Sequence, residues 1–138
     1  MKTLYTAEVS ATGGRSGHVR SSTGIIDLDM SVPEGLGGKK GATNPEELFA
    51  AGYAACFQSA LLLVAGKQKI NLEKESTVTA KVSLNQLDGG NYGLSVKLDV
   101  DLKGVDKEQA NQLVKEAHEV CPYSVGTRGN IDVELNVV

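Results

Sequence analysis

The sequence predicts an α+β fold, in which helices pack against one face of an antiparallel β-sheet. Two kinds of pattern indicate it. Apolar and polar residues alternate with a period of two through residues 77–87 and 94–102, which is typical of half-buried strands. Apolar residues recur at helical spacing after residue 106, and an almost wholly apolar stretch of helical length runs from residue 48 to residue 68.

The 138 residues suit one domain with a single core, so we expect residues 1–138 to form one domain. The formal net charge is -3 with scattered basic residues, and aromatic residues make up 4%, which argues against nucleic acid as a partner. No window approaches about 18 consecutive apolar residues, and the N-terminus lacks secretory features. We therefore expect a cytoplasmic protein with no membrane partner.

The N-terminal third predicts two short strands, at residues 4–10 and 25–30. Between them, the glycine-rich segment 13–17 predicts a turn that presents Arg15. Residues 31–43 are rich in glycine and predict a long irregular loop of the kind that often forms a lid or a binding loop.

The start of the long helix is well marked. Asn44 is a favourable N-cap, Pro45 suits the first helical position, and Glu47 completes a capping box. Because the capping box occupies Glu47, Glu46 is the carboxylate left to hold an arginine. A simpler role for Glu46, as a favourable charge at a helix N-terminus, is equally compatible with the sequence.

The second half of the chain predicts a hairpin, a helix and a final strand. The sequence Asp-Gly-Gly-Asn at residues 88–91 joins the two alternating strands. A second helix begins at Asp106, with Gln109 three residues later, and we expect it to end at Pro122. Alternation at residues 131–137 predicts the last strand.

The two cysteines are either inert or redox-active, because a structural disulfide is uncommon in a reducing compartment. Cys56 lies in the middle of the apolar helix, where burial raises the thiol pKa and the helix dipole contributes little. A reactive Cys56 therefore needs a cation from another segment. Arg15 is the best candidate, and Arg20 and Arg128 are alternatives.

Spacing along the helix favours a dimer. Glu46 and Cys56 are ten residues apart, which is about 15 Å of helical rise. A compact Glu–Arg–Cys cluster within one chain would be strained, whereas the arginine and glutamate of one chain can meet the cysteine of another. A helix that is apolar on all sides also needs more burial than a small monomer provides.

Cys121 stands at the end of the second helix, and spacing alone does not show whether it comes within disulfide reach of Cys56. His118 lies one turn before it, where we expect the imidazole to face solvent among charged neighbours. The two cysteines and two histidines show no zinc-binding spacing, so we expect no metal site.

Several segments resemble the organic hydroperoxide resistance proteins (Ohr) of the OsmC/Ohr family, and the likeness covers essentially the whole chain. The segments that carry it are Ala-Thr-Gly-Gly-Arg at 11–15, Thr-Asn-Pro-Glu-Glu-Leu-Phe-Ala-Ala-Gly-Tyr-Ala-Ala-Cys-Phe at 43–57, Val-Cys-Pro-Tyr-Ser at 120–124 and Thr-Arg-Gly-Asn-Ile at 127–131. One departure is Val125-Gly126, where the family pattern leads us to expect Asn-Ala.

The resemblance implies an OsmC-like fold, with antiparallel sheets packed around a long buried central helix in an intertwined homodimer. It implies that Cys56 is the peroxidatic thiolate, that Cys121 resolves it as a disulfide, and that Arg15 and Glu46 organise the site. It implies alkyl and fatty-acid hydroperoxides as substrates. It also implies no bound cofactor, and a dihydrolipoyl dithiol, as dihydrolipoamide or on a lipoylated protein, as external reductant.

On this interpretation the apolar helix and the loop around Leu36 line a pocket that favours hydrophobic peroxides over hydrogen peroxide. The OsmC branch of osmotically induced peroxidases shares the fold and chemistry, but the Gly-Gly-Arg and Cys-Pro-Tyr-Ser segments favour Ohr. Two other functions use the same residues differently. A redox sensor would use the disulfide to change partner binding, and a carrier of hydrophobic ligands would need neither thiol.

Overall fold

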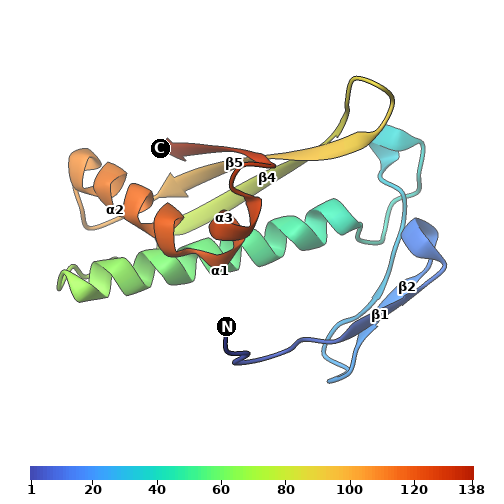
Figure 1. The fold of residues 1–138 in the computed structure, drawn as a ribbon, viewed down its shortest axis with the longest axis horizontal. Coiled ribbons are helices and arrows are strands. Elements are labelled where there is room, and N and C mark those ends of the chain that lie inside the picture. The colour runs from blue at the N-terminus through green and yellow to red at the C-terminus, as the bar shows by residue number, and fades with distance from the viewer. The chain divides into compact units, whose positions relative to one another are not determined.

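A computed structural model describes residues 1–138, which divide into two compact units, residues 1–48 and residues 49–138. Each unit is described by itself. The elements, shown in Figure 1, are β1 (Val9–Thr12), the 3-10 helix η1 (Gly14–Ser16), β2 (His18–Ser21), β3 (Asp27–Asp29), the 3-10 helix η2 (Glu34–Leu36), α1 (Pro45–Lys67), β4 (Thr77–Gln86), β5 (Tyr92–Asp101), α2 (Lys107–Val120), α3 (Pro122–Thr127) and β6 (Asp132–Val137).

The first unit is a three-stranded antiparallel sheet in the order β1-β2-β3. The glycine turn forms as expected, with η1 joining β1 to β2. The sequence pattern missed β2, because four residues of mixed polarity are too few to show alternation. The first and third strands are also shorter than expected. Met30 is the one buried residue in this unit, so the sheet has almost no core of its own.

The second unit contains the sheet β4-β5-β6. β4 and β5 form the expected antiparallel hairpin, with Val78 opposite Val100 and Val82 opposite Val96. β6 runs parallel to β5, so this sheet is mixed and not antiparallel throughout as expected. The reason is the connection: α2 and α3 carry the chain from the end of β5 back along the sheet, and a long helical crossover permits a parallel neighbour.

The core of the second unit lies between one face of this sheet and the helices α1 and α2 (Figure 1). The register aligns the apolar side chains of the three strands on that face, because Leu98 lies opposite both Ala80 and Leu135. From α1 the core receives six buried side chains: Tyr53, Phe57, Ala60, Leu61, Val64 and Ala65. The alternation seen in the sequence therefore decides which face of the sheet is buried.

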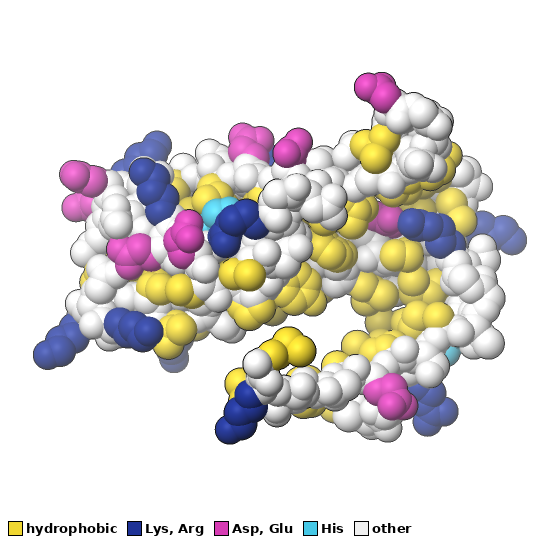
Figure 2. All heavy atoms as spheres, viewed as in Figure 1, with side chains coloured by type: hydrophobic (Ala, Val, Ile, Leu, Met, Phe, Trp, Pro, Cys, Tyr) yellow, Lys and Arg dark blue, Asp and Glu magenta, His cyan; other side chains and the backbone are white.

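The long helix α1 is only partly covered. Its length and its mean hydropathy of 1.8 would allow it to span a bilayer, but a core helix of a folded protein has the same features. On the side away from the core, Leu62 and Leu63 are 56% and 53% exposed. Hydrophobic side chains reach the surface over this helix and over the N-terminal segment in Figure 2.

The connection between α2 and β6 contains a short helix that was not expected. Asp106 caps α2 as predicted, and its side chain accepts a hydrogen bond from the Gln109 N–H at 2.7 Å. Pro122 follows the end of α2, but it also occupies the first position of α3. Proline suits that position because it has no N–H to leave unpaired. Cys121 is therefore the single residue between two helices.

Candidate active site

The two thiols lie side by side in the second unit. The Sγ atoms of Cys56 and Cys121 are 3.4 Å apart, and both cysteines are free. Cys56 is half-buried in the middle of α1, whereas Cys121 is fully buried at the junction of α2 and α3. A disulfide has an S–S length of about 2.0 Å, so a small rearrangement would allow the two sulfurs to bond.

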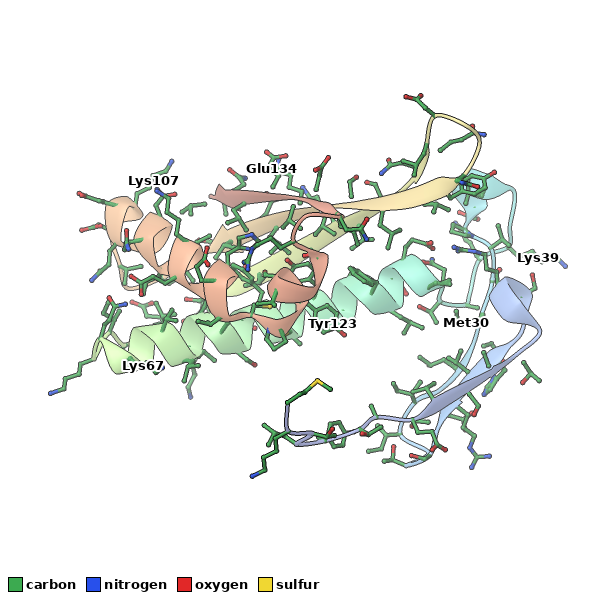
Figure 3. The ribbon with its side chains drawn as sticks, viewed as in Figure 1. Met30, Lys39, Lys67, Lys107, Tyr123 and Glu134 are labelled. Atoms are coloured by element: carbon green, nitrogen blue, oxygen red, sulfur yellow. The ribbon has the colours of Figure 1, made fainter.

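Small residues on α1 leave room for an aromatic side chain beside Cys56. A Cβ added to Gly52 would lie 2.5 Å from the Tyr123 hydroxyl, so a larger residue would displace that ring. The Tyr123 ring packs at 5.8 Å from Phe49 and 5.5 Å from Tyr53, measured between centroids. Figure 3 shows Tyr123 where α3 meets α1. Gly52 thus lets the Tyr123 ring of α3 pack closely against the helix that carries Cys56.

Burial raises the pKa of the Cys56 thiol, and the neighbouring Cys121 thiol raises it further. The backbone N–H of Tyr123 opposes this shift and lowers the pKa. None of the groups that shift this pKa carries a positive charge. The thiol is therefore a weak nucleophile in its immediate surroundings, as its position in the helix predicts, and its activation requires a cation.

Arg15 and Glu46 form a two-pronged ion pair in the first unit. The Arg15 guanidinium donates from Nη1 to Glu46 Oε2 at 2.8 Å and from Nη2 to Glu46 Oε1 at 2.6 Å. The Arg15 hydrogen bonds lower the pKa of the Glu46 carboxyl, and the same bonds raise the pKa of Arg15. The Arg15 side chain is 41% exposed. Glu46 thus holds an arginine, which is one of the two roles that the sequence left open for it.

The turn that carries Arg15 requires glycine. Gly13 has a φ of 75°, in the left-handed region. A Cβ on Gly17 would collide with the carbonyl oxygen of Thr12. These two glycines let the chain reverse tightly around η1 and present the Arg15 side chain.

The capping box at the start of α1 is only half formed. The Asn44 side chain accepts a hydrogen bond from the Glu47 N–H at 2.8 Å, as expected for an N-cap. The Glu47 carboxylate, however, accepts from the Thr43 hydroxyl at 2.8 Å and has no bond to the Asn44 N–H. The prediction of a reciprocal bond from the Asn44 N–H to Glu47 is therefore wrong. The Thr43 hydroxyl is the donor to the Glu47 carboxylate instead.

The two alternative arginines are placed differently. Arg128 donates from Nη2 to the carbonyl oxygen of His118 at 2.7 Å, which fixes it to the end of α2. Arg20 is exposed on β2, where it lies opposite Asp27 in the strand register. Only Arg15 among the three forms a bidentate pair with a carboxylate.

His118 does not face solvent as expected. It is half-buried, and its Nδ1 lies 2.8 Å from the Ser124 hydroxyl. Ser124 in turn lies 2.7 Å from the Tyr53 hydroxyl, and both of these residues are fully buried. Sequence reasoning missed this hydrogen-bond chain. A tyrosine within an apolar helix was the available signal, since a buried phenolic hydroxyl needs a polar partner.

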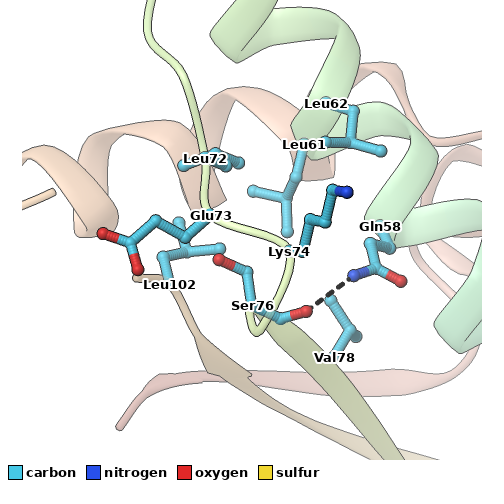
Figure 4. Close-up of a pocket in the computed structure, with 9 residues that line it drawn as sticks. All are labelled: Gln58, Leu61, Leu62, Leu72, Glu73, Lys74, Ser76, Val78 and Leu102. Carbon is cyan, nitrogen blue, oxygen red and sulfur yellow. Dashed lines mark hydrogen bonds between the residues drawn. The ribbon is translucent and has the colours of Figure 1, made fainter. Parts of the chain in front are cut away.

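A separate hollow of about 250 Å³ lies beside the C-terminal half of α1 (Figure 4). Its apolar wall is formed by Leu61, Leu72, Val78 and Leu102, and Gln58 Nε2 donates to the Ser76 carbonyl oxygen at 2.9 Å across it. Neither cysteine lines this hollow. No group of three or more His, Cys, Asp or Glu side chains converges where a metal ion could bind.

Comparison with known proteins gives consistent matches. The family model described as OsmC-like protein matches residues 37–136. The organic hydroperoxide resistance protein of Xanthomonas axonopodis pv. citri is 49% identical over 99% of this chain and 96% of its own length. OhrA of Bacillus subtilis is 51% identical over 97% of this chain and 96% of its own length.

A solved structure agrees in fold. The crystal structure of an organic hydroperoxide resistance protein from Legionella pneumophila superposes with a TM-score of 0.92 at 50% identity, covering 99% of this chain and 98% of that one. This match includes the long helix and both sheets, so the predicted OsmC-like fold is confirmed. The motifs, the fold and the nearly full-length similarity together place the chain in the OsmC/Ohr family, among proteins named for organic hydroperoxide resistance.

Proposed function

We propose that the protein is a thiol peroxidase that reduces organic hydroperoxides and so confers resistance to them, with Cys56 as the attacking thiol and Cys121 as the resolving thiol. The single observation that carries the proposal is the 3.4 Å approach of the two free sulfurs. Relatives over nearly the full length are named organic hydroperoxide resistance proteins, which supports this substrate class.

The proposed chemistry has two steps. The Cys56 thiolate attacks the terminal oxygen of the peroxide, the O–O bond breaks, and the alkoxide takes a proton and leaves as the alcohol. Cys56 becomes a sulfenic acid. The Cys121 sulfur then attacks the Cys56 sulfur, forming the S–S bond and breaking the S–O bond, while the hydroxide leaves with the Cys121 proton as water. A dithiol returns both cysteines to thiols by exchange through a mixed disulfide.

The Arg15–Glu46 pair supplies the positive charge that Cys56 lacks. Burial raises the Cys56 pKa, and a guanidinium stays charged in an apolar site, so an arginine beside the sulfur would restore the thiolate. Glu46 holds the guanidinium in a fixed orientation. Glu46 and Cys56 remain ten residues apart on α1, about 15 Å of rise, so we propose that the pair acts on the cysteine of a second chain.

The active form in this proposal is a homodimer. Leu62 and Leu63 on α1 are more than half exposed, and in the first unit Leu4 and Ile25 are 87% and 86% exposed. A monomer that leaves this much apolar surface in water is unfavourable, and a second copy would cover it. The family fold implied by the motifs is an intertwined dimer of this kind.

The substrates we propose are alkyl and fatty-acid hydroperoxides. Leu36 ends η2 and is 62% exposed, so it is available to contact a substrate chain. The reductant is a dihydrolipoyl dithiol, and no bound cofactor takes part. Two free thiols at this distance suit the reducing cytoplasm, where we place the protein.

Steady-state reduction of tert-butyl hydroperoxide by dihydrolipoamide tests the proposal directly. We expect the wild-type protein to turn over and Cys56→Ser to lose at least about 1,000-fold in rate, because the nucleophile is gone. Wild-type turnover by Cys56→Ser would overturn the assignment. A ligand carrier would show no turnover at all, and a sensor would be oxidised once without catalytic cycling.

The variant Cys121→Ser separates the two thiols. We expect its first oxidation to proceed at nearly the wild-type rate, because the attacking thiol is intact. Without a resolving thiol, excess peroxide should then convert Cys56 to sulfinic acid, which mass spectrometry detects as a gain of two oxygens. Sustained cycling of this variant without overoxidation would remove the resolving role of Cys121.

A further inference from the structure

The hydrogen-bond chain Tyr53–Ser124–His118 links the helices that carry or flank the two thiols. His118 lies in the last turn of α2 and Ser124 lies in α3, so their 2.8 Å contact closes the bend that has Cys121 at its apex. Tyr53 lies on α1, three residues before Cys56, and its 2.7 Å contact fastens that bend to the helix of the other thiol. The chain therefore connects all three elements on which the cysteines are mounted.

The bend itself has few other restraints. The Cys121 N–H donates to the Ala117 carbonyl oxygen at 2.8 Å, and the Cys121 carbonyl oxygen accepts from the Val125 N–H at 2.9 Å. These bonds continue α2 and begin α3, but neither fixes the angle between the two helices. Two side-chain contacts that span the bend do: the His118 ring with the Ser124 hydroxyl, and the Arg128 guanidinium with the His118 carbonyl oxygen at 2.7 Å.

Packing alone does not account for three polar groups in this place. Tyr53 and Ser124 are fully buried, and moving a hydroxyl from water into a core is unfavourable unless it finds a partner. Phenylalanine and alanine would fill the same space without that cost. The hydroxyls make directional contacts. Hydrogen bonds hold the helices at one angle and spacing, whereas apolar contacts allow the helices to slide.

The direction of the hydrogen bonds follows from the state of His118. Burial lowers the pKa of this imidazole and the positive charge of Arg128 lowers it further, while Glu119 opposes the shift. His118 is therefore neutral near pH 7, and the tautomer with its proton on Nε2 leaves Nδ1 free to accept. In that tautomer the Ser124 hydroxyl donates to Nδ1 and the Tyr53 hydroxyl donates to the Ser124 oxygen, which pairs both hydroxyl protons.

On this geometry we propose that Tyr53, Ser124 and His118 are positioning residues for the second chemical step: they hold Cys121 in line for attack on the oxidised Cys56, and protonation of His118 weakens that hold. This inference rests on the proposed resolving role of Cys121. A protonated Nδ1 must donate, so the Ser124 hydroxyl turns toward Tyr53, whose own hydroxyl then has no acceptor. The Ser124–Tyr53 bond remains, but the unpaired Tyr53 proton weakens the attachment of the bend to α1, and disulfide formation slows.

Other charged groups near His118 bear on its titration. Lys115, Glu116 and Glu119 lie on α2 around the hollow that His118 lines, and Leu135 of β6 closes that hollow with an apolar side chain. Arg128 approaches from the end of α3, where its guanidinium binds the His118 carbonyl oxygen. On the inner side the imidazole meets Ser124, and through it Tyr53. Of these groups, His118 is the one whose ordinary pKa lies nearest neutrality.

Two rates measured after one equivalent of peroxide separate positioning from fold stability. Rapid mixing gives the rate of Cys56 oxidation, and quenched samples analysed by mass spectrometry give the rate of disulfide formation. We expect Tyr53→Phe, which keeps the ring and removes the hydroxyl, to oxidise Cys56 within about twofold of wild type and to form the disulfide about tenfold more slowly. Ser124→Ala removes the central hydroxyl of the hydrogen-bond chain and should change the two rates in the same way.

The conservative variant His118→Asn should retain fast disulfide formation, whereas the apolar variant His118→Leu should lose it. Its side-chain amide places a polar atom near the position of Nδ1 but does not titrate. We expect disulfide formation near the wild-type rate at pH 7.5 and no slowing toward pH 5, where the wild type slows. His118→Leu, which removes the polar atom, should match Tyr53→Phe at every pH.

The outcomes distinguish the two proposals. If the wild type oxidises Cys56 but forms no bond to Cys121, the proposed resolving role fails and this inference fails with it. If the wild type forms the disulfide and neither Tyr53→Phe nor Ser124→Ala changes its rate, the inference alone is overturned. A loss of melting temperature without a change in the ratio of the two rates would also overturn it, because that is the result expected from a purely structural role.

Discussion

In residues 49–138, fifteen buried side chains form one core that includes Cys121 and packs against Cys56. In residues 1–48, Met30 alone is buried, and the group of interest is an ion pair whose arginine is 41% exposed. One unit holds its sulfurs by packing, and the other holds its charge by hydrogen bonds on a glycine turn. The thiol pair is thus built within one chain, whereas the role proposed for the charged pair requires a second chain.

The contrast extends to the pKa of the groups involved. Packing around Cys56 raises its pKa and keeps it a thiol, while pairing in the first unit lowers the pKa of Glu46 and keeps it a carboxylate. The environment of Cys56 thus favours the neutral thiol, and the environment of Glu46 favours the carboxylate that pairs with Arg15. The proposed enzyme needs both, because a thiolate forms in the apolar site only when the fixed charge arrives.

The largest effect should come from removing that charge. We expect Arg15→Ala to slow Cys56 oxidation by at least about 100-fold, because a positioned charge in an apolar site is worth that much in rate. Arg20→Ala, on the next strand of the same sheet, is the matched control and should stay within about twofold. Stopped-flow oxidation with excess peroxide measures both. Equal effects of the two substitutions would show that the Arg15–Glu46 pair has no special role.

Mixing two inactive variants tests whether the charge crosses between chains. Arg15→Ala and Cys56→Ser chains, unfolded and refolded together in equal amounts, should regain about a quarter of wild-type activity, since half the dimers are mixed and each has one intact site. Refolding each variant by itself is the control and should regain none. Mixed dimers verified by native mass spectrometry but inactive would place Arg15, Glu46 and Cys56 of one site in the same chain.

Packing in the second unit can be tested with two glycines. Gly52→Ala should destabilise the protein by about 1–3 kcal/mol, because the added Cβ meets the Tyr123 hydroxyl at 2.5 Å and the ring must move. Gly126→Ala in α3 is the control. It has no atom within 4 Å of its added Cβ, and alanine in a helix should stabilise by about 0.5–1 kcal/mol. Denaturant unfolding measures both, and equal changes in the unfolding free energy would contradict the packing described.

The smallest expected effect concerns two histidines whose pKa values are shifted in opposite directions. In the first unit the His18 ring contacts Asp29 at 2.8 Å and Asp27 at 2.5 Å, and these bonds raise its pKa. The stability they contribute is present below the ordinary histidine pKa of about 6.5 and is lost as pH rises through the raised value. For His118, whose pKa burial lowers, stability is instead lost as pH falls below about 6.5.

Amide hydrogen exchange resolves the two histidines, because each affects its own unit. We expect protection in β2 and β3 to decrease from pH 6 to pH 9 after correction for the intrinsic exchange rate. His18→Asn should remove this dependence and leave α2 and α3 unchanged. Loss of protection in β2 and β3 toward acid would have the wrong sign and would contradict the role of the two aspartates.

Much of the fold could be predicted because local patterns decide it. The Asn44-Pro45 start fixes where α1 begins, and period-two alternation fixes which side chains of β4 and β5 are buried. The strand β2 and the short helix α3 could not be predicted, because four and six residues give no reliable period. The parallel direction of β6 also escaped, since strand direction follows from the path of the preceding helices and not from the strand's own residues.

The residues of the candidate site also divide into those that local sequence predicts and those that the packing of helices brings together. The sequence alone indicates that Cys56 lies in an apolar helix and that its thiol needs a cation, which Arg15 on a glycine turn could provide with Glu46 to hold it. The fold is what brings the two sulfurs to 3.4 Å and joins Tyr53, Ser124 and His118 in one hydrogen-bond chain. The physical reason is that residue type and spacing fix local conformation and charge, whereas contacts between residues 65 or 71 positions apart depend on how whole helices pack.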